Sequence, residues 1–191
     1  MAAGVIRVAV SIARSRGVRP LATTALLALL LTGCGAGATT RTPPPSPTLA
    51  VPSISPVIAD TQRVVAAALA QDQFQLEDAQ QPYRPPESAS VAAAPRAVFQ
   101  VVMPSDPTHG YIVVYEFRDE PSAAAAGNEL AAYLGSGPGR VQFASDVQHL
   151  IREVGTTLVV YSWSPSAATD PRAGRIFADL STVGTGIAVP R

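Results

Sequence analysis

The stretch YIVVYEF, from Tyr111 to Phe117, is the clearest secondary-structure signal in the chain. β-branched and aromatic residues fill it, and such residues favour extended strands. A similar run, AVFQVVM at residues 97–103, precedes it across a loop rich in turn-forming residues. After it, Pro121 opens an alanine-rich segment that continues to Leu134, and this pattern predicts a helix. The region therefore predicts two strands followed by a helix.

The same order of elements recurs nearer the C-terminus. Residues 147–153 and 157–163 predict two strands around a tight turn, and residues 170–182 predict a capped helix. The LVVYSW segment of the later strand also resembles the IVVYEF segment of the earlier one. We interpret the two regions as β-β-α units with a weak internal similarity.

A further helix is predicted ahead of these units, because Ser55 and Pro56 match an N-cap and a first helical position. Apolar residues follow at helical spacing, namely Ile58, Val65, Leu69 and Leu76, and the helix is predicted to stop near Gln71. Residues 74–77 fit either the last turn of this helix or a short strand. The proline-rich residues 80–96 predict a loop.

These elements predict an α+β fold for a single domain over residues 55–191. We expect a two-layer sandwich, in which an antiparallel sheet of about four strands comes from the two β-β-α units. The N-terminal helix and the helices of the units would cover one face of the sheet. An antiparallel sheet tolerates a solvated second face.

Four aromatic residues form a candidate binding face on the predicted sheet. Strand side chains alternate between faces, and counting by twos along each unit groups Tyr115, Phe117, Tyr161 and Trp163 together. If this face is open, it forms an apolar platform for a ligand or partner. Alternatively, these aromatic side chains are core residues beneath the helices.

The N-terminal 33 residues have the organisation of an export signal. Four arginines and no acidic residue lie within the first 20 positions, and an uncharged apolar run follows at residues 21–31. The run ends in LTGC, from Leu31 to Cys34, which resembles the bacterial lipobox. This resemblance implies a thioether-linked diacylglycerol on Cys34 and cleavage between Gly33 and Cys34. Cys34 is the single cysteine of the chain.

The lipobox resemblance implies a membrane anchor on the extracytoplasmic side, with the cell membrane holding the acyl chains. Residues 1–33 are then the lipoprotein signal peptide, and residues 34–54 are the lipidated cysteine and a proline-rich tether. The alternative is an uncleaved membrane helix that carries an incidental cysteine. The mature domain is loosely similar to small bacterial lipoproteins of unassigned role, and this similarity implies no catalytic residue.

Composition excludes several function classes. All 14 basic residues are arginine, so lysine-dependent catalysis is excluded, and no Gly-x-Ser-x-Gly motif is present. After residue 20, ten arginines face 14 acidic residues, which argues against nucleic-acid binding. His109 and His149, each with an aspartate three residues earlier, are weak candidates for metal ligands. No cofactor is expected.

Three functions remain open at this point. The first is a non-catalytic module that binds an envelope protein through its sheet face or through the loop at residues 80–96. The second is a binder of a small or lipidic ligand between sheet and helices. The third is a metal-dependent hydrolase that uses His109 and His149.

Overall fold

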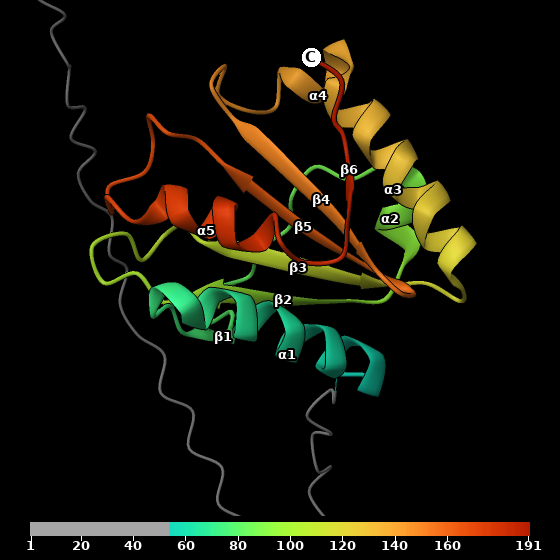
Figure 1. Ribbon diagram of the computed structural model, residues 1–191. Coiled ribbons are helices and arrows are strands. Elements are labelled where there is room, and N and C mark those ends of the chain that lie inside the picture. The colour runs from blue at the N-terminus through green and yellow to red at the C-terminus, as the bar shows by residue number, and fades with distance from the viewer. Residues whose placement is uncertain (1–53) are drawn as a thin grey trace, which may run out of the picture. The chain divides into compact units, whose positions relative to one another are not determined.

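The computed structural model of the protein describes residues 54–191 (Figure 1). The predicted signal peptide, Cys34 and the tether up to residue 53 lie outside these residues. Within residues 54–191, no helix is long and apolar enough to cross a membrane. The elements in chain order are α1 (Pro56–Leu69), η1 (Ala70–Asp72), β1 (Leu76–Asp78), α2 (Ala89–Ala93), β2 (Arg96–Val101), β3 (Tyr111–Glu116), α3 (Glu120–Gly135), α4 (Gly137–Arg140), β4 (Gln148–Val154), β5 (Thr157–Trp163), α5 (Ala173–Leu180) and β6 (Thr185–Ile187).

The strands form one antiparallel six-stranded sheet in the order β1-β2-β3-β5-β4-β6. The α+β class is confirmed, and both predicted β-β-α successions are present as β2-β3-α3 and β4-β5-α5. The prediction of about four strands is too low. It does not count the two edge strands: β6 is not predicted, and a short strand near β1 is only one of the two alternatives for residues 74–77. Each edge strand has three residues, which is too short to show a sequence period.

Helices cover both faces of the sheet, so the predicted two-layer sandwich is wrong. On one face α1 and α5 pack on Ile112 and Tyr161, and on the other face α3 packs on Tyr115 and Leu158. Figure 1 shows α1 and α5 together on one side of the sheet and α3 on the other. The physical reason is that β3 and β5 are apolar on both faces, which a sheet with one solvated face does not require.

The two β-β-α units are not copies of one arrangement. Both α3 and α5 contact β4 and β5, but from opposite faces of the sheet. If the two units were copies, a rotation about an axis perpendicular to the sheet would superimpose one hairpin on the other. Such a rotation does not move a helix to the other face of the sheet, so both helices would lie on the same face. The sequence similarity of the two units therefore reflects a shared strand composition and not a repeated structure.

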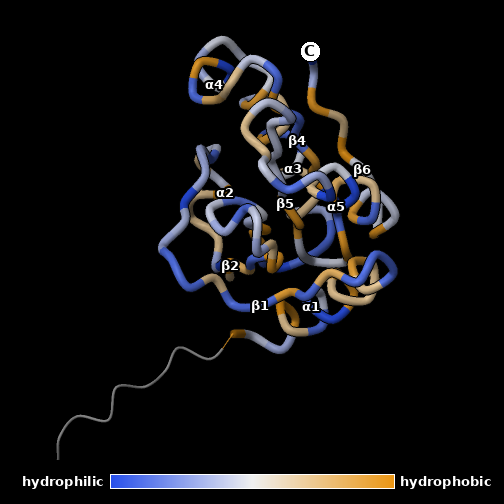
Figure 2. The backbone as a smooth tube through the Cα atoms, turned by 90° about the vertical axis from the view of Figure 1, so that its left-hand side faces the viewer, coloured by the Kyte–Doolittle hydropathy of each residue, from blue (hydrophilic) through white to orange (hydrophobic). Residues whose placement is uncertain are grey.

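The helix starts follow the capping residues of the sequence. The Ser55 hydroxyl accepts a hydrogen bond from the amide of Ile58 at 3.1 Å, and the Asp119 carboxylate accepts one from the amide of Ser122 at 2.9 Å. Hydrogen bonds from Ser122 and then Arg118 lower the pKa of Asp119 to about 2. Figure 2 shows both hydrophobic and hydrophilic residues along α1.

The segment between α1 and β2 contains more structure than predicted. After η1, Gln73 adopts a positive φ of 63°, and the chain then enters β1 at Leu76. Residues 74–77 thus lead into a short strand and do not extend the helix. The predicted loop at residues 80–96 contains α2, which escapes detection because it has only five residues.

Candidate functional site

The four aromatic residues of the predicted binding face do not share a face. Tyr115 is 0% exposed and Tyr161 is 2% exposed. Tyr115 lies opposite Leu158 on β5, while Tyr161 lies opposite Ile112 on β3. The two tyrosines therefore point into different cores, Tyr115 towards α3 and Tyr161 towards α1 and α5. The open aromatic platform is wrong, and the alternative that these two tyrosines are core residues is confirmed.

Trp163 packs against the core on the face of the sheet that α1 and α5 cover. Its ring centre lies 6.5 Å from that of Phe177 in α5, and a Cβ at Gly174 would come within 3.3 Å of the indole ring. Its indole Nε1 is buried and has no hydrogen-bond partner among the described residues. Glycine at position 174 thus permits the close approach of α5 to this ring, which points to a packing role.

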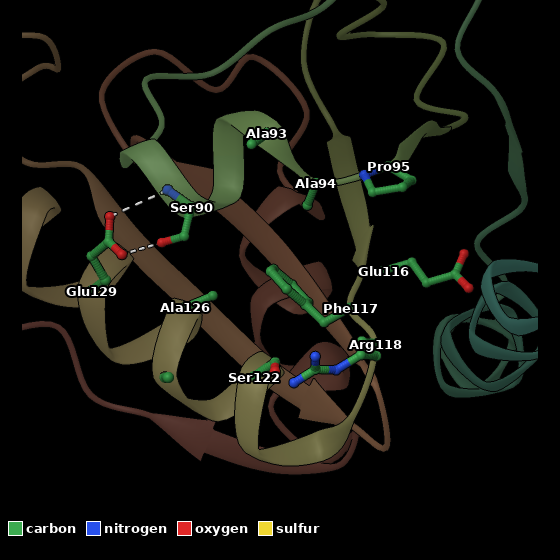
Figure 3. A pocket seen from close by; sticks show the side chains of 11 residues that line it. Ser90, Ala93, Ala94, Pro95, Glu116, Phe117, Arg118, Ser122, Ala126 and Glu129 are labelled. Atoms are coloured by element: carbon green, nitrogen blue, oxygen red, sulfur yellow. Dashed lines mark hydrogen bonds between the residues drawn. The ribbon is translucent and has the colours of Figure 1, made fainter.

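Phe117, another of the predicted binding residues, lines a hollow that we call the helix groove. This groove lies between α2, α3 and the end of β3, and has a volume of about 530 Å³. Figure 3 shows Phe117 in its middle, with Ser90 and Glu129 at one end. Its lining comprises Ser90, Ala93, Ala94, Pro95, Glu116, Phe117, Arg118, Ser122, Ala125, Ala126 and Glu129.

The carboxylates that line the helix groove accept hydrogen bonds from serines. Glu129 accepts hydrogen bonds from the hydroxyl and the amide of Ser90, and the hydroxyl bond is the main cause that lowers the pKa of Glu129. Glu116 accepts a hydrogen bond from Ser55, the N-cap of α1. In a Ser-His-Asp triad the nucleophilic serine donates to an imidazole, whereas Ser90 donates to a carboxylate. The lining residues include no histidine.

A buried carboxylate holds the chain between β1 and β2 onto the sheet. The side chain of Glu87 is 3% exposed. It accepts hydrogen bonds from Arg84 Nε at 2.8 Å, from Arg96 Nη1 at 3.0 Å and from the Tyr115 hydroxyl at 2.8 Å. Burial and then the bond to Glu87 raise the pKa of Tyr115, so its hydroxyl remains a donor. We call these four residues the Glu87 cluster.

A second hollow lies beside the Glu87 cluster, and we call it the arginine hollow. It has a volume of about 570 Å³ and is lined by residues 79–84, Arg96 and Val98. Tyr83 forms one of its walls and stacks on Tyr111 of β3, with ring centres 4.3 Å apart and planes 5° apart. The pKa of Tyr83 is raised, mainly because the side chain is buried. The wall is therefore attached to the sheet by an aromatic stack as well as by ion pairs.

The two histidines are not brought together. His109 Nδ1 pairs with Asp106 at 2.5 Å, and Asp106 also accepts a hydrogen bond from the amide of Thr169. His149 lies on β4, bonds the Ser162 hydroxyl at 2.8 Å, and contacts Phe143 edge-on. His149 lies on β4, and His109 lies just before β3. Because β5 runs between these two strands, they are about 10 Å apart.

The two imidazoles therefore do not converge on a common metal position. Among residues 54–191, no group of three or more His, Cys, Asp or Glu side chains is placed to hold a metal ion. Burial lowers the pKa of His149, which favours its neutral form in a packing role. For Asp106, burial acts to raise the pKa, but the hydrogen bonds from His109 and Thr169 outweigh it and lower the pKa. Asp106 thus joins two loops as an ionised acceptor.

No family model, curated protein or solved structure matches the chain. Within the described residues, the two hollows and the segment that lines both of them are the candidate binding features. Residues 79–84 form a wall of the arginine hollow, and Ser90 to Pro95 form a wall of the helix groove. Sequence analysis identified the segment at residues 80–96 as a candidate interaction loop, but it did not identify the Glu87 cluster.

One carboxylate outside these hollows gives a prediction about pH. Asp179 Oδ2 is buried with no hydrogen-bond partner among the described residues, and burial followed by the charge of Asp72 raises the Asp179 pKa. A folded-state pKa above the unfolded value means that stability is present at low pH and is lost as pH rises through the folded pKa. We expect Asp179→Asn to raise the free energy of unfolding at pH 7 by up to about 1 kcal/mol.

Urea unfolding of both proteins at pH 4 and pH 7 checks this prediction. The gain from Asp179→Asn should shrink at pH 4, near the unfolded pKa of about 3.9. Asp60→Asn is the matched control, because Asp60 is exposed and pairs only with Arg63 on the same helix. Equal stability of wild type and Asp179→Asn at pH 7 contradicts the destabilising role of this carboxylate.

Proposed function

We propose that the protein is a lipid-anchored protein of the bacterial cell envelope, whose domain is a non-catalytic protein-interaction module on the extracytoplasmic side. The segment at residues 79–96 is the proposed binding element. The observation that carries this proposal is that this one segment lines both hollows. Helices cover both faces of the sheet, so no open sheet face is available to a partner, and binding residues are often carried by connecting segments.

The binding segment is held in place before any partner arrives. The Glu87 cluster fixes its middle, the Tyr83 stack fixes its first half, and the bonds from Ser90 to Glu129 fix its end. Association costs less conformational entropy when the binding surface is already ordered. This rigidity supports a binding role, because an unsupported loop of this length would have to be ordered by its partner.

A second candidate function is the binding of a small apolar or lipidic ligand in the helix groove. Phe117, Pro95 and four alanines supply an apolar lining, and a volume of about 530 Å³ is within the range of small-molecule sites. This groove lies at the surface, beside α2 and α3, and not between the sheet and its covering helices as the sequence analysis expected. A lipid that co-purifies with the protein in a fixed ratio would favour this function.

Photo-crosslinking in intact cells tests the interaction module. A photoreactive residue at Gln81, which is exposed on the binding segment, is expected to give one dominant protein adduct from membranes. The matched control is the same residue at Ala67, which is exposed on α1 and lines neither hollow. Absence of any adduct from Gln81, or the same adducts from both positions, contradicts the proposed function.

A further inference from the structure

The arginine hollow has an excess of positive charge. Arg84 and Arg96 line it, and none of its lining residues is acidic. Glu87 lies behind them and neutralises one of the two charges. From the two guanidiniums, Glu87 accepts hydrogen bonds only from Nε of Arg84 and from Nη1 of Arg96. Each guanidinium has five N–H donors, so most of them remain for a ligand in the hollow.

Both guanidiniums combine a fixed position with access from solvent. The Arg84 side chain is 60% exposed and the Arg96 side chain 26% exposed, whereas Glu87 is 3% exposed. The buried carboxylate holds the two cations close together, and the Tyr115 hydroxyl holds the carboxylate. Charge-assisted hydrogen bonds from guanidinium groups suit planar carboxylates, because both groups can pair through two parallel bonds.

The first residues of β2 adjoin the same hollow and have no strand partner on their outer side among the described residues. β1 pairs with β2 only between Phe99 and Val101, and one further bond joins the Ala79 amide to the Val98 carbonyl. β2 itself begins at Arg96, so its first residues extend beyond the end of β1. An extended peptide can lie along such an unpaired edge and place alternate side chains in a neighbouring hollow.

The local charge pattern favours a protein ligand over a membrane surface. Recognition of anionic lipid by a polybasic surface requires about four to eight basic residues in a cluster, and this hollow has two. The adjacent strand β1 carries the exposed carboxylates Glu77 and Asp78, which would repel an anionic membrane. The lining of the hollow itself includes two arginines and no acidic residue, which favours a short acidic peptide segment that is narrow enough to enter it.

We propose that the arginine hollow binds carboxylate side chains of an acidic, extended segment of the partner protein. Arg84 and Arg96 recognise the carboxylates, and the beginning of β2 accommodates the extended backbone. This inference rests on the proposed function, because it assigns the chemistry of the partner to one part of the binding segment.

Binding of a short fluorescent glutamate-rich peptide to the full chain in neutral detergent tests the proposal. We expect measurable binding at low salt that weakens as salt increases, and a loss of about tenfold in affinity for Arg84→Gln. Arg84→Gln leaves Glu87 paired with Arg96 and Tyr115, and an unchanged melting temperature would verify that it folds. The matched control Arg63→Gln removes an exposed arginine on α1 and should bind as wild type does.

Three results would overturn the proposal. These are no binding of the peptide, equal binding by wild type and Arg84→Gln, and binding to phosphatidylglycerol vesicles in place of the peptide. The Gln81 crosslink distinguishes this failure from that of the proposed function. If the adduct persists in the Arg84→Gln background, the interaction module stands without the acidic partner; if the wild type gives no adduct, the interaction module itself fails.

Discussion

Replacing Glu87 by alanine is expected to lower the free energy of unfolding by about 3–5 kcal/mol, which is the cost of removing one partner from a buried ion pair. The Glu87 side chain is 3% exposed and is the shared acceptor for Arg84, Arg96 and the Tyr115 hydroxyl. Its loss leaves the partly buried Arg96 without a counter-charge. It also leaves the hydroxyl of Tyr115, which is 0% exposed, without its acceptor.

Urea unfolding followed by circular dichroism measures this effect. Glu87→Gln should fall between alanine and wild type, because the amide oxygen still accepts one hydrogen bond but carries no charge. Glu77→Ala is the matched control, since Glu77 is an exposed glutamate on β1, and its effect should remain within about 0.5 kcal/mol. A Glu87→Ala protein as stable as wild type would show that the cluster does not hold the binding segment on the sheet.

The Glu87→Ala substitution is also expected to weaken binding in both hollows. Without Glu87 the two guanidiniums of the arginine hollow repel each other and lose their common support. The chain that continues into α2 loses its attachment to β3, and this chain also lines the helix groove. Both hollows should therefore bind less well in folded Glu87→Ala, whereas Glu77→Ala should affect neither.

The strands that run through the centre of the sheet are predictable because local composition determines them. β3 and β5 are continuous β-branched and aromatic runs, and the predicted ranges agree with the observed strands to within about a residue. The starts of α1 and α3 are predictable for a similar reason, since Ser55 and Asp119 cap the helices with their own side chains. These features depend on neighbours within a few positions of the sequence.

The assignment of residues to sheet faces depends on the register between β3 and β5, which is not local. An alignment of the two units in the same direction places Tyr115 with Tyr161. The strands are antiparallel and pair Tyr115 with Leu158, an odd position with an even one, so the two tyrosines lie on opposite faces. The apolar character of both faces was visible in the sequence, and it is the signal that indicates helices on both sides.

The Glu87 cluster is also invisible to local patterns. Arg84 and Glu87 stand in a proline-rich stretch, where a charged residue is ordinarily exposed, and Arg96 is nine positions from Glu87. Only the return of the chain onto β3 brings Tyr115 to the carboxylate. The sequence therefore indicates the segment that we propose for binding, but not the arrangement of charges within it.

Replacing Cys34 by alanine is expected to abolish acylation of the protein completely. The lipobox chemistry requires a thiolate at this position, and the chain has no other cysteine. Two acyl chains give stable anchoring, whereas one gives only marginal membrane binding. Mass spectrometry of the wild type from membranes should find an N-terminal peptide that begins at Cys34 and carries diacylglycerol.

The Cys34→Ala protein should lack this peptide and retain Gly33 joined to residue 34, because the peptidase acts on the lipidated precursor. Thr32→Ala is the matched control, since it exchanges one small residue for another beside the cleavage position and should leave processing intact. The alternative of an uncleaved membrane helix predicts a different outcome, in which the wild type begins at Met1 with a free thiol and Cys34→Ala changes nothing except that thiol. An unmodified wild-type chain would therefore remove the lipid anchor from the proposed function, while the interaction module of residues 55–191 would still be tested by its own crosslinks.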